Sequence, residues 1–440
     1  MDKRRNPFRT AIELGKDLLI VLLACSALWM LGNVGLFQRV GLTSDERPQV
    51  SGQQETVTGQ ADAARPMRIT VTLRGGEEPE RRVVQYDDGA VTALYQQVAG
   101  ILMETLSSAG GPETVSRRDW ERALAQAPGI CFDFQGEMPL SVLSGWLDVE
   151  QGLPEALMRR LLLTVWGDSV ALYYYDLSGG TWQRCTTQVV GPAQLENALE
   201  GLDANGAYYA FEAETTAGMA PDTVLLPELE PMPVYTAVNP VSGGRNALEG
   251  LMNDLNFNLS GCVFYHAADE EVARLGSDTV RLSTGGVLEY HAGEDGIMQF
   301  PVTAVPGKSE LFSVVECCRQ LLLRSVSGRC GQGRMYLSTA KQTAQGWELE
   351  FEYSLNGAGV TLKDGPAARF TVRSGCVTGF TICLRSYSVS EERQPILPPV
   401  QAAAAMRALA LEGRELQLIY RDGGEERVLP NWTAVVDEAG

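Results

Sequence analysis

The stretch "WELEFEYSL", residues 347–355, decides the fold class. Its apolar side chains alternate strictly with polar ones, and they are Trp347, Leu349, Phe351, Tyr353 and Leu355. A period of two puts successive side chains on opposite faces of a strand, and one buried face with one wet face is typical of antiparallel sheets. The stretch therefore predicts an antiparallel sheet that has a core on one side.

Further strand patterns lie on both sides of this stretch. "RITVTL" (68–73) and "RRVVQY" (81–86) are typical of strands, and so is "GICFDF" (129–134). Paired patterns around Gly-Gly turns predict hairpins at 169–190, 278–293 and 416–436. The strands are thus expected throughout the chain rather than in one half of it.

Helical spacing of apolar residues occurs between the strands. Val91, Leu94 and Val98 begin one such helix, and Ser116 with Asp119 forms the capping-box pattern that opens a second. Other helices are expected near 246–256, over "SELFSVVECCRQLLLRSVSG" (309–328) and in the Ala-rich segment that starts at 396. The predicted fold class is α+β, with several modules of helices packed on one face of antiparallel sheets.

An apolar stretch, "LLIVLLACSALWMLGNVGLF" (18–37), stands near the start of the chain. As a helix, 20 residues rise about 30 Å, the thickness of a hydrocarbon core. A secretory signal cut near Ala24 and Ser26, or a lipid attached at Cys25, are the alternatives. Both would leave an unusually long apolar run beyond the processing point, because signal peptides have apolar regions of only ~7–15 residues. The sequence favours an uncleaved transmembrane helix.

Charge gives the expected orientation of this anchor and excludes one class of ligand. Residues 1–16 hold five basic and two acidic side chains, so the N-terminus is expected in the cytoplasm and the main body outside the cell membrane. The net charge of the whole chain is −19, which leaves about −22 on the remainder. Such an acidic body argues against nucleic acid as a partner.

Composition suggests how the rest of the chain is divided. "TSDERPQVSGQQETVTGQADAARP" (43–66) has almost no large apolar residues, and "LPELEPMPVY" (226–235) concentrates Pro227, Pro231 and Pro233. The expected segments are a cytoplasmic N-terminus (1–17), a transmembrane helix (18–37), a flexible stalk (38–66), and three α+β domains (67–228, 229–306 and 307–440).

One set of motifs suggests a penicillin-binding enzyme. Ser338 and Lys341 have S-x-x-K spacing, "SLN" supplies Ser354 and Asn356, and "KDG" supplies Lys363 and Gly365. That chemistry needs the serine on a helix with the lysine one turn later. Here the tetrapeptide extends a strand pattern, so alternation should direct Ser338 and Lys341 to opposite faces. The sequence therefore predicts no nucleophile at Ser338, and no catalytic residue elsewhere.

Neither the histidines nor the cysteines form a recognisable site. His266 and His291 are the only histidines and lack the spacing of metal ligands, so no metal and no cofactor are expected. Cys25 lies in the apolar stretch, and eight other cysteines follow it without any C-x-x-C pair. Disulfides are possible among these eight, but their pairing is left open by the sequence.

The layout resembles that of a known regulator family. A basic N-terminus and anchor are followed by "LMNDLNFNL" (251–259) and "DTVRLSTGGVLEYHAG" (278–293). At the end, "ILPPVQAAAAMRALALEGRELQLIYRD" (396–422) and "VLPNWTAVVD" (428–437) resemble the closing elements of YycI and PepSY-like modules. In these features the chain is similar to YycH-type regulators, with a C-terminal module like that of YycI.

The resemblance implies a function that depends on protein contact. YycH and YycI proteins are single-pass proteins that hold the cell-wall-sensing histidine kinase WalK in check. A sensor histidine kinase, together with a second YycI- or YycH-type protein, is therefore the expected partner. Within the anchor, Ser26 and Asn33 are seven residues apart and share a helix face, so they are the candidate docking face. The alternative function is binding of cell-wall fragments or another small ligand outside the cell.

Overall fold

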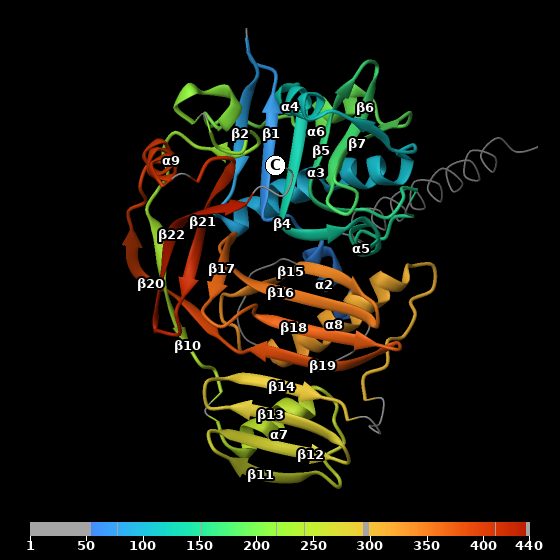
Figure 1. Ribbon diagram of the computed structural model, residues 1–440. Helices are drawn as coiled ribbons and strands as arrows, with labels where there is room; N and C mark the ends of the chain where they lie inside the picture. Colours follow the sequence, from blue (N-terminus) through green and yellow to red (C-terminus); the bar gives the residue numbers. More distant parts are fainter. Residues whose placement is uncertain are drawn as a thin grey trace, which may run out of the picture. The chain divides into compact units, whose positions relative to one another are not determined.

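Two large sheets make up most of the structure, a computed structural model that describes residues 54–436 except 77, 151, 217, 242, 294–298 and 410. Figure 1 shows both sheets with their helices. The helices are α2 (Gln54–Ala63), α3 (Asp88–Ser108), α4 (Arg117–Ala125), α5 (Leu140–Trp146), α6 (Pro192–Ala198), α7 (Arg245–Asp254), α8 (Glu310–Val326) and α9 (Pro399–Ala408). The α+β class predicted from the sequence is confirmed.

The predicted anchor, 18–37, lies outside the described residues, and so do Ser26 and Asn33. Among the helices of the described part, none has the length and apolar character needed to cross a bilayer. The end of the predicted stalk differs from expectation. Residues 54–63 form α2, Ala64 after it is buried, and the Arg319 guanidinium donates to the carbonyl of Gly59 at 3.1 Å. These contacts bind the last turns of that segment to the folded body.

The first sheet has seven strands in the order β2-β1-β4-β5-β6-β7-β3. Their bounds are β1 (Arg68–Leu73), β2 (Glu80–Val84), β3 (Glu113–Val115), β4 (Gly129–Pro139), β5 (Leu157–Trp166), β6 (Ser169–Asp176) and β7 (Thr181–Thr187). A separate pair, β8 (Tyr208–Tyr209) with β9 (Val224–Leu225), completes this part.

Both faces of the first sheet are covered, contrary to the expectation of helices on one face only. Ile130 and Phe132 of β4 pack with α3, whereas Cys131 between them packs with Trp120 of α4. The reason is in the sequence of the central strands, which is apolar at consecutive positions and so must be buried on both sides. The predicted capping box is present: the Ser116 hydroxyl accepts from the backbone N–H of Asp119, and the Asp119 carboxylate accepts from Ser116.

The second sheet has thirteen strands. Twelve follow in the order β11-β12-β13-β14-β19-β18-β16-β17-β21-β22-β10-β20, and β15 pairs with β16. Their bounds are β10 (Met232–Val238), β11 (Val263–Ala267), β12 (Glu270–Leu275), β13 (Asp278–Ser283), β14 (Val287–His291), β15 (Arg334–Thr343), β16 (Gly346–Leu355), β17 (Ala358–Leu362), β18 (Ala368–Arg373), β19 (Cys376–Cys383), β20 (Ser386–Gln394), β21 (Arg414–Asp422) and β22 (Arg427–Val436).

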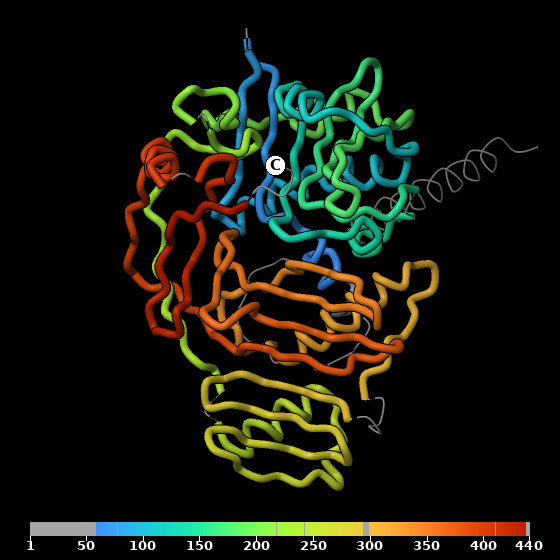
Figure 2. Tube along the Cα trace, viewed as in Figure 1, coloured from blue at the N-terminus to red at the C-terminus, as the bar shows by residue number. Residues whose placement is uncertain are grey.

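Strand pairing in this sheet joins distant parts of the chain. β14 pairs with β19, and β10 lies between β20 and β22, as the trace in Figure 2 also shows. Residues 347–355 belong to β16, where Leu349, Phe351 and Tyr353 are buried as predicted. These pairings connect segments that lie on either side of the expected domain borders at residues 228 and 306. Residues 56–440 form one compact unit.

The closing hairpin forms as expected, and its tryptophan, Trp432, is only partly buried. Trp432 packs only partly against the apolar side chains around it, and its indole N–H donates to the carbonyl of Leu397 at 2.8 Å. Because β22 lies near the border of the sheet, fewer elements are available to cover the ring.

Candidate functional site

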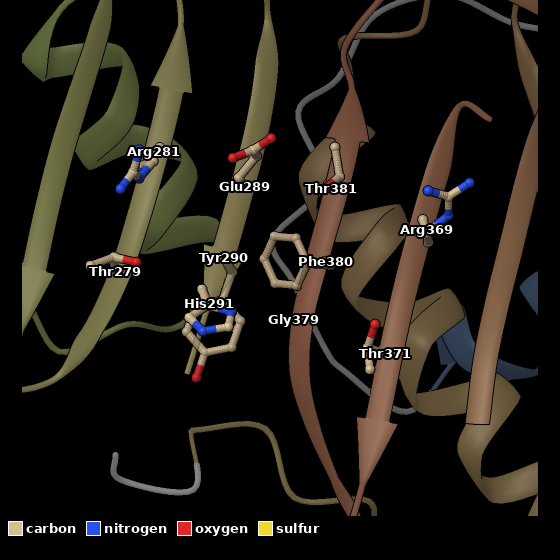
Figure 3. Close-up of a pocket in the computed structure, with 10 residues that line it drawn as sticks. All are labelled: Thr279, Arg281, Glu289, Tyr290, His291, Arg369, Thr371, Gly379, Phe380 and Thr381. Carbon is tan, nitrogen blue, oxygen red and sulfur yellow. The ribbon is translucent and has the colours of Figure 1, made fainter. Parts of the chain in front are cut away.

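A row of polar side chains crosses the exposed face of the second sheet. Strand register places Arg281 opposite Glu289, then Thr381, then Arg369, and finally Glu350, on five neighbouring strands. Figure 3 shows the first four of them side by side on β13, β14, β19 and β18. The next residues along each strand, such as Tyr290 after Glu289 and Phe380 before Thr381, are buried on the other face of the sheet. Alternation along each strand thus produces a charged face opposite an apolar core.

A hollow of about 400 Å³ lies over this face. A second row, Thr279, His291, Gly379 and Thr371, lies next to the first, and Gly379 is at its centre. Since glycine has no side chain, the sheet surface is lowest there. The hollow opens along the sheet surface, so it suits contact with a protruding group of another molecule better than enclosure of a small ligand.

Ion pairs hold two of the arginines of the row. Arg369 Nη2 lies 2.7 Å from Glu350 Oε1, and Arg281 Nη1 lies 3.4 Å from Glu270 Oε2. Both arginines are about half exposed, with relative side-chain exposures of 56% and 49%. Exposed pairs of this kind contribute only ~0–1 kcal/mol to stability. Their charges therefore remain available to a partner.

The polar row continues to the first sheet. Thr339 of β15 lies opposite Glu350, and its hydroxyl donates to Glu137 Oε2 of β4 at 2.6 Å.

A second and stronger connection between the two sheets is a buried cluster of six charged side chains, three cationic and three anionic. They are Arg68, Arg159, Arg160, Asp133, Asp222 and Glu415.

Glu415 is the member of this cluster that comes from the closing hairpin. Its carboxylate accepts from Arg68 at 2.9 Å, from Arg159 at 2.8 Å and from Arg160 at 2.5 Å. Asp133 of β4 accepts from the same three arginines, and Arg160 also pairs with Asp222. With three charges of each sign, the cluster is neutral as a whole. It attaches strand β21 to the interior of the first sheet.

The arginines determine the protonation of both carboxylates. Burial alone would raise the pKa of Glu415, but the guanidinium groups of Arg159, Arg160 and Arg68 lower it to about 2. Against the same desolvation, these arginines hold the pKa of Asp133 well below its usual value. Both groups are therefore ionised across the physiological range, and neither is available as a general acid or base.

The residues of the penicillin-binding motifs do not form a catalytic group. Ser338 lies on strand β15, as predicted, but a β-bulge at Ser338 interrupts the pairing with β16 between Leu337 and Thr339. The bulge adds one residue to β15 at this point, so the simple alternation of faces does not run from Ser338 to Lys341. The expectation that the two side chains lie on opposite faces is therefore wrong. The strand itself, not the alternation, is what distinguishes Ser338 from the helical nucleophile of that family.

Asn356 of the second motif has a structural role. Its amide donates to the carbonyl of Tyr86 at 2.6 Å and accepts from the backbone N–H of Asp88 at 3.1 Å. It has a positive φ of 52°, a conformation that asparagine tolerates in turns. Lys363 and Gly365 follow in another turn after β17. Within the described ranges, no group of three or more His, Cys, Asp or Glu side chains could hold a metal ion.

His266 and His291 are both on the surface and lie far apart in the strand order, on β11 and β14. His266 Nδ1 is 3.0 Å from Glu271, and His291 borders the hollow. All eight cysteines outside the apolar stretch are free thiols.

Sequence reasoning missed both the polar row and the buried cluster. The row follows from strand register, which a single sequence does not reveal. The cluster left a clearer signal, because "LMRRLLL" (157–163) and "FDF" (132–134) place charges inside strongly apolar strands. Charges in such positions are expected to be paired.

Comparison with known proteins identifies the fold. No family model and no curated protein sequence matches the chain. Among solved structures, the chain is similar to the crystal structure of YycH from Bacillus subtilis, with a TM-score of 0.54 and 10% sequence identity. The similarity covers 86% of this chain and 95% of that one. The resemblance expected from the sequence is thus confirmed at the level of structure, and the chain has the YycH fold.

Proposed function

We propose that this protein is a membrane-anchored extracytoplasmic regulator of a cell-envelope sensor histidine kinase, acting through protein contact. The observation that carries the proposal is the fold similarity to YycH, which extends over nearly the whole of that chain. Residues 18–37 supply the anchor in this proposal, and the N-terminus is cytoplasmic. A second YycI- or YycH-type protein is a further expected partner.

Two surfaces contribute to contact with the kinase. The outside contact is the polar row, where Arg281, Glu289 and Arg369 present alternating charges on a face that no described helix covers. The contact in the membrane is the helix face of Ser26 and Asn33, because polar and small residues allow helices to approach and to form hydrogen bonds.

Kinase output in cells tests this proposal. Deletion of the gene should change expression of a reporter controlled by the kinase, and the wild-type gene should restore it. Replacing Arg281 and Arg369 together by Glu should reproduce part of the deletion, at normal protein level and melting temperature. Exchange of the exposed Arg274 for Glu, outside the hollow, is the matched control. Unchanged reporter expression after deletion would contradict the proposal.

The anchor is tested separately. Replacing Ser26 and Asn33 by Leu should leave the protein in the membrane and change kinase output, because the polar helix face that contacts the kinase is lost. A reporter domain fused after Gly440 should be active only when it is outside the cell. Release of a shortened protein into the medium would contradict the anchor.

The ligand-binding alternative has one observation in its favour, the hollow over Gly379 with His291 and Arg369 near it. A soluble muropeptide is a suitable probe. Saturable binding to the wild type that Gly379→Leu abolishes would support a small-ligand function, because the leucine would fill the hollow.

A further inference from the structure

Strands β10 and β22 separate after two residue pairs. Tyr235 pairs with Val428, and the N–H of Ala237 donates to the carbonyl of Glu426 at 2.6 Å. Hydrogen-bonded pairs alternate along an antiparallel ladder, so the next such pair would join Pro233 and Pro430. Neither proline has an N–H to donate. The two prolines therefore end the ladder and leave the rest of β22 without a neighbour on that side.

The remaining part of β22 is a free sheet edge. By the same alternation, Trp432, Ala434 and Val436 direct their backbone N–H and C=O groups toward the side that β10 leaves. No backbone hydrogen bond from another described segment reaches that side of residues 430–436. An edge of this kind is a template for pairing with another extended chain.

An apolar groove of about 520 Å³ runs along this edge. It lies between α9, the hairpin β21–β22 and residues 394–397. Five consecutive residues of β22 line it, from Pro430 to Ala434, which shows that the groove follows the edge of the strand as well as one face. Large apolar side chains near its mouth are exposed, with Leu409 at 70% and Leu397 at 45%. Soluble proteins generally keep such patches for interaction.

Among the described residues, Arg421 is the only charged one that lines the groove. Its side chain is exposed, and it makes no ion pair or side-chain hydrogen bond with any described residue. Most other arginines near the hairpin have partners: Arg427 pairs with Glu392, and Arg385 pairs with Asp422 at 2.8 Å. On a strongly acidic protein, an unpaired guanidinium beside an apolar groove selects for a carboxylate.

We infer that β22 and this groove bind an extended segment of a partner protein, which adds a strand to the sheet at residues 431–436. The segment carries bulky apolar side chains for the groove and one carboxylate for Arg421. Main-chain hydrogen bonds provide affinity in this mode, and the side chains provide specificity. The inference rests on the proposed function only in taking the partner to be the sensor kinase.

Photocrosslinking in cells tests the inference with the full chain in its membrane. Benzoylphenylalanine is placed at Leu409 beside the groove, and at Val263 on β11 as a control that is 62% exposed. Peptide mapping then identifies the residues that are crosslinked. The expected result is a crosslink from position 409 to an extended, apolar, carboxylate-bearing segment of the kinase, and none to that segment from position 263.

Two pairs of variants test how the segment is held. Ala434→Pro removes an outward N–H while the bonds to β21 remain, and Ala434→Ser keeps that N–H. Arg421→Glu reverses the charge, and Arg421→Lys keeps it. Ala434→Pro and Arg421→Glu should each lower the crosslink yield about tenfold at unchanged melting temperature. The reason is that loss of a hydrogen bond to a strand or to a charged group reduces affinity by about that factor. Ala434→Ser and Arg421→Lys should retain most of the crosslink yield.

The outcomes separate this inference from the proposed function. If deletion of the gene changes kinase output but position 409 crosslinks to no protein, the groove inference is wrong and the regulatory function stands. If position 409 crosslinks to an apolar, acidic segment of another envelope protein, the groove inference stands and the kinase assignment is wrong. A crosslink to a second copy of this chain, or equal yields from all four variants, overturns the inference.

Discussion

Arg68 and Glu415 form a direct ion pair, with 2.9 Å between Nη2 and Oε1, although 347 positions separate them in the sequence. Both side chains are almost fully buried, with 5% and 1% of their surfaces exposed. The first strand of the first sheet is therefore attached to the closing hairpin of the second. Loss of either partner would leave an unpaired charge inside the protein.

Glu415→Gln should strongly destabilise the protein. The substitution leaves Arg68, Arg159 and Arg160 with one carboxylate fewer in a buried site, and breaking a buried ion pair costs about 3–5 kcal/mol of unfolding free energy. Urea denaturation of the purified protein measures the change. Glu412→Gln, at an exposed position close to it in sequence, is the control and should change the free energy little. Equal midpoints for the two variants would contradict the assignment.

Acid should destabilise the protein through the same cluster. The folded pKa of Glu415 is about 2 and lies below that of an unfolded glutamate, so its ionised form stabilises the fold above about pH 4. This stability is lost as the pH falls from about 4 toward 2. Melting temperatures measured across this range should fall steeply for the wild type and less steeply for Glu415→Gln.

Glu352 should have the opposite pH dependence. Burial raises its pKa to about 7, and its Oε2 atom is buried without a partner among the described residues. A raised carboxyl pKa means that stability is full below about pH 4 and decreases as the pH rises through 7. Glu352→Gln should stabilise the protein by roughly 1 kcal/mol at pH 8 and hardly at pH 4, since partial hydration reduces the effect. Glu348→Gln, on an exposed carboxylate of the same strand, is the control.

Reducing agents should leave the melting temperature unchanged, because all eight cysteines outside the apolar stretch are free. Burial raises the pKa of Cys131 to about 12 and that of Cys185 to about 11, so these thiols should resist a thiol-specific reagent in the native protein. Cys262, which is only partly buried, should react first. A disulfide would instead appear as a loss of about 2–4 kcal/mol on reduction.

Trp432→Ala should cost less than removal of a fully buried tryptophan. Its ring is only partly covered, so the expected loss is about 1–2 kcal/mol rather than the ~3–5 kcal/mol typical of a buried aromatic side chain. Thermal unfolding measures this loss. A large loss would indicate that the groove beside β22 is closed in solution.

Local patterns predicted the elements because local physics determines them. Alternation in residues 347–355 identified β16, and Ser116 with Asp119 identified the start of α4. The pairing of strands was not accessible in the same way. Nothing in the segment 232–238 indicates that its neighbours are β20 and β22, because register depends on which distant strand buries the same face.

The candidate surfaces could be predicted from the sequence only in part. A charge such as Asp133 within "FDF" signals a buried ion pair, but not which arginine it meets. The bulge at Ser338 was also invisible, since "STAK" reads as an ordinary strand. That Arg281 lies beside Glu289, and Arg369 beside Glu350, is known only from the strand register of the folded sheet.

The position of β10 affects how a nascent chain can reach this fold. Thr236 pairs with Arg427, about 190 residues later. At about 5–20 residues per second, ribosomes need roughly 10–40 s to make the intervening chain. For most of that time β10 has emerged without either neighbour, because β20 is also made late, and exposed strands of this kind tend to aggregate. Strand β10 can therefore pair with its neighbours only after nearly the whole chain has been synthesised.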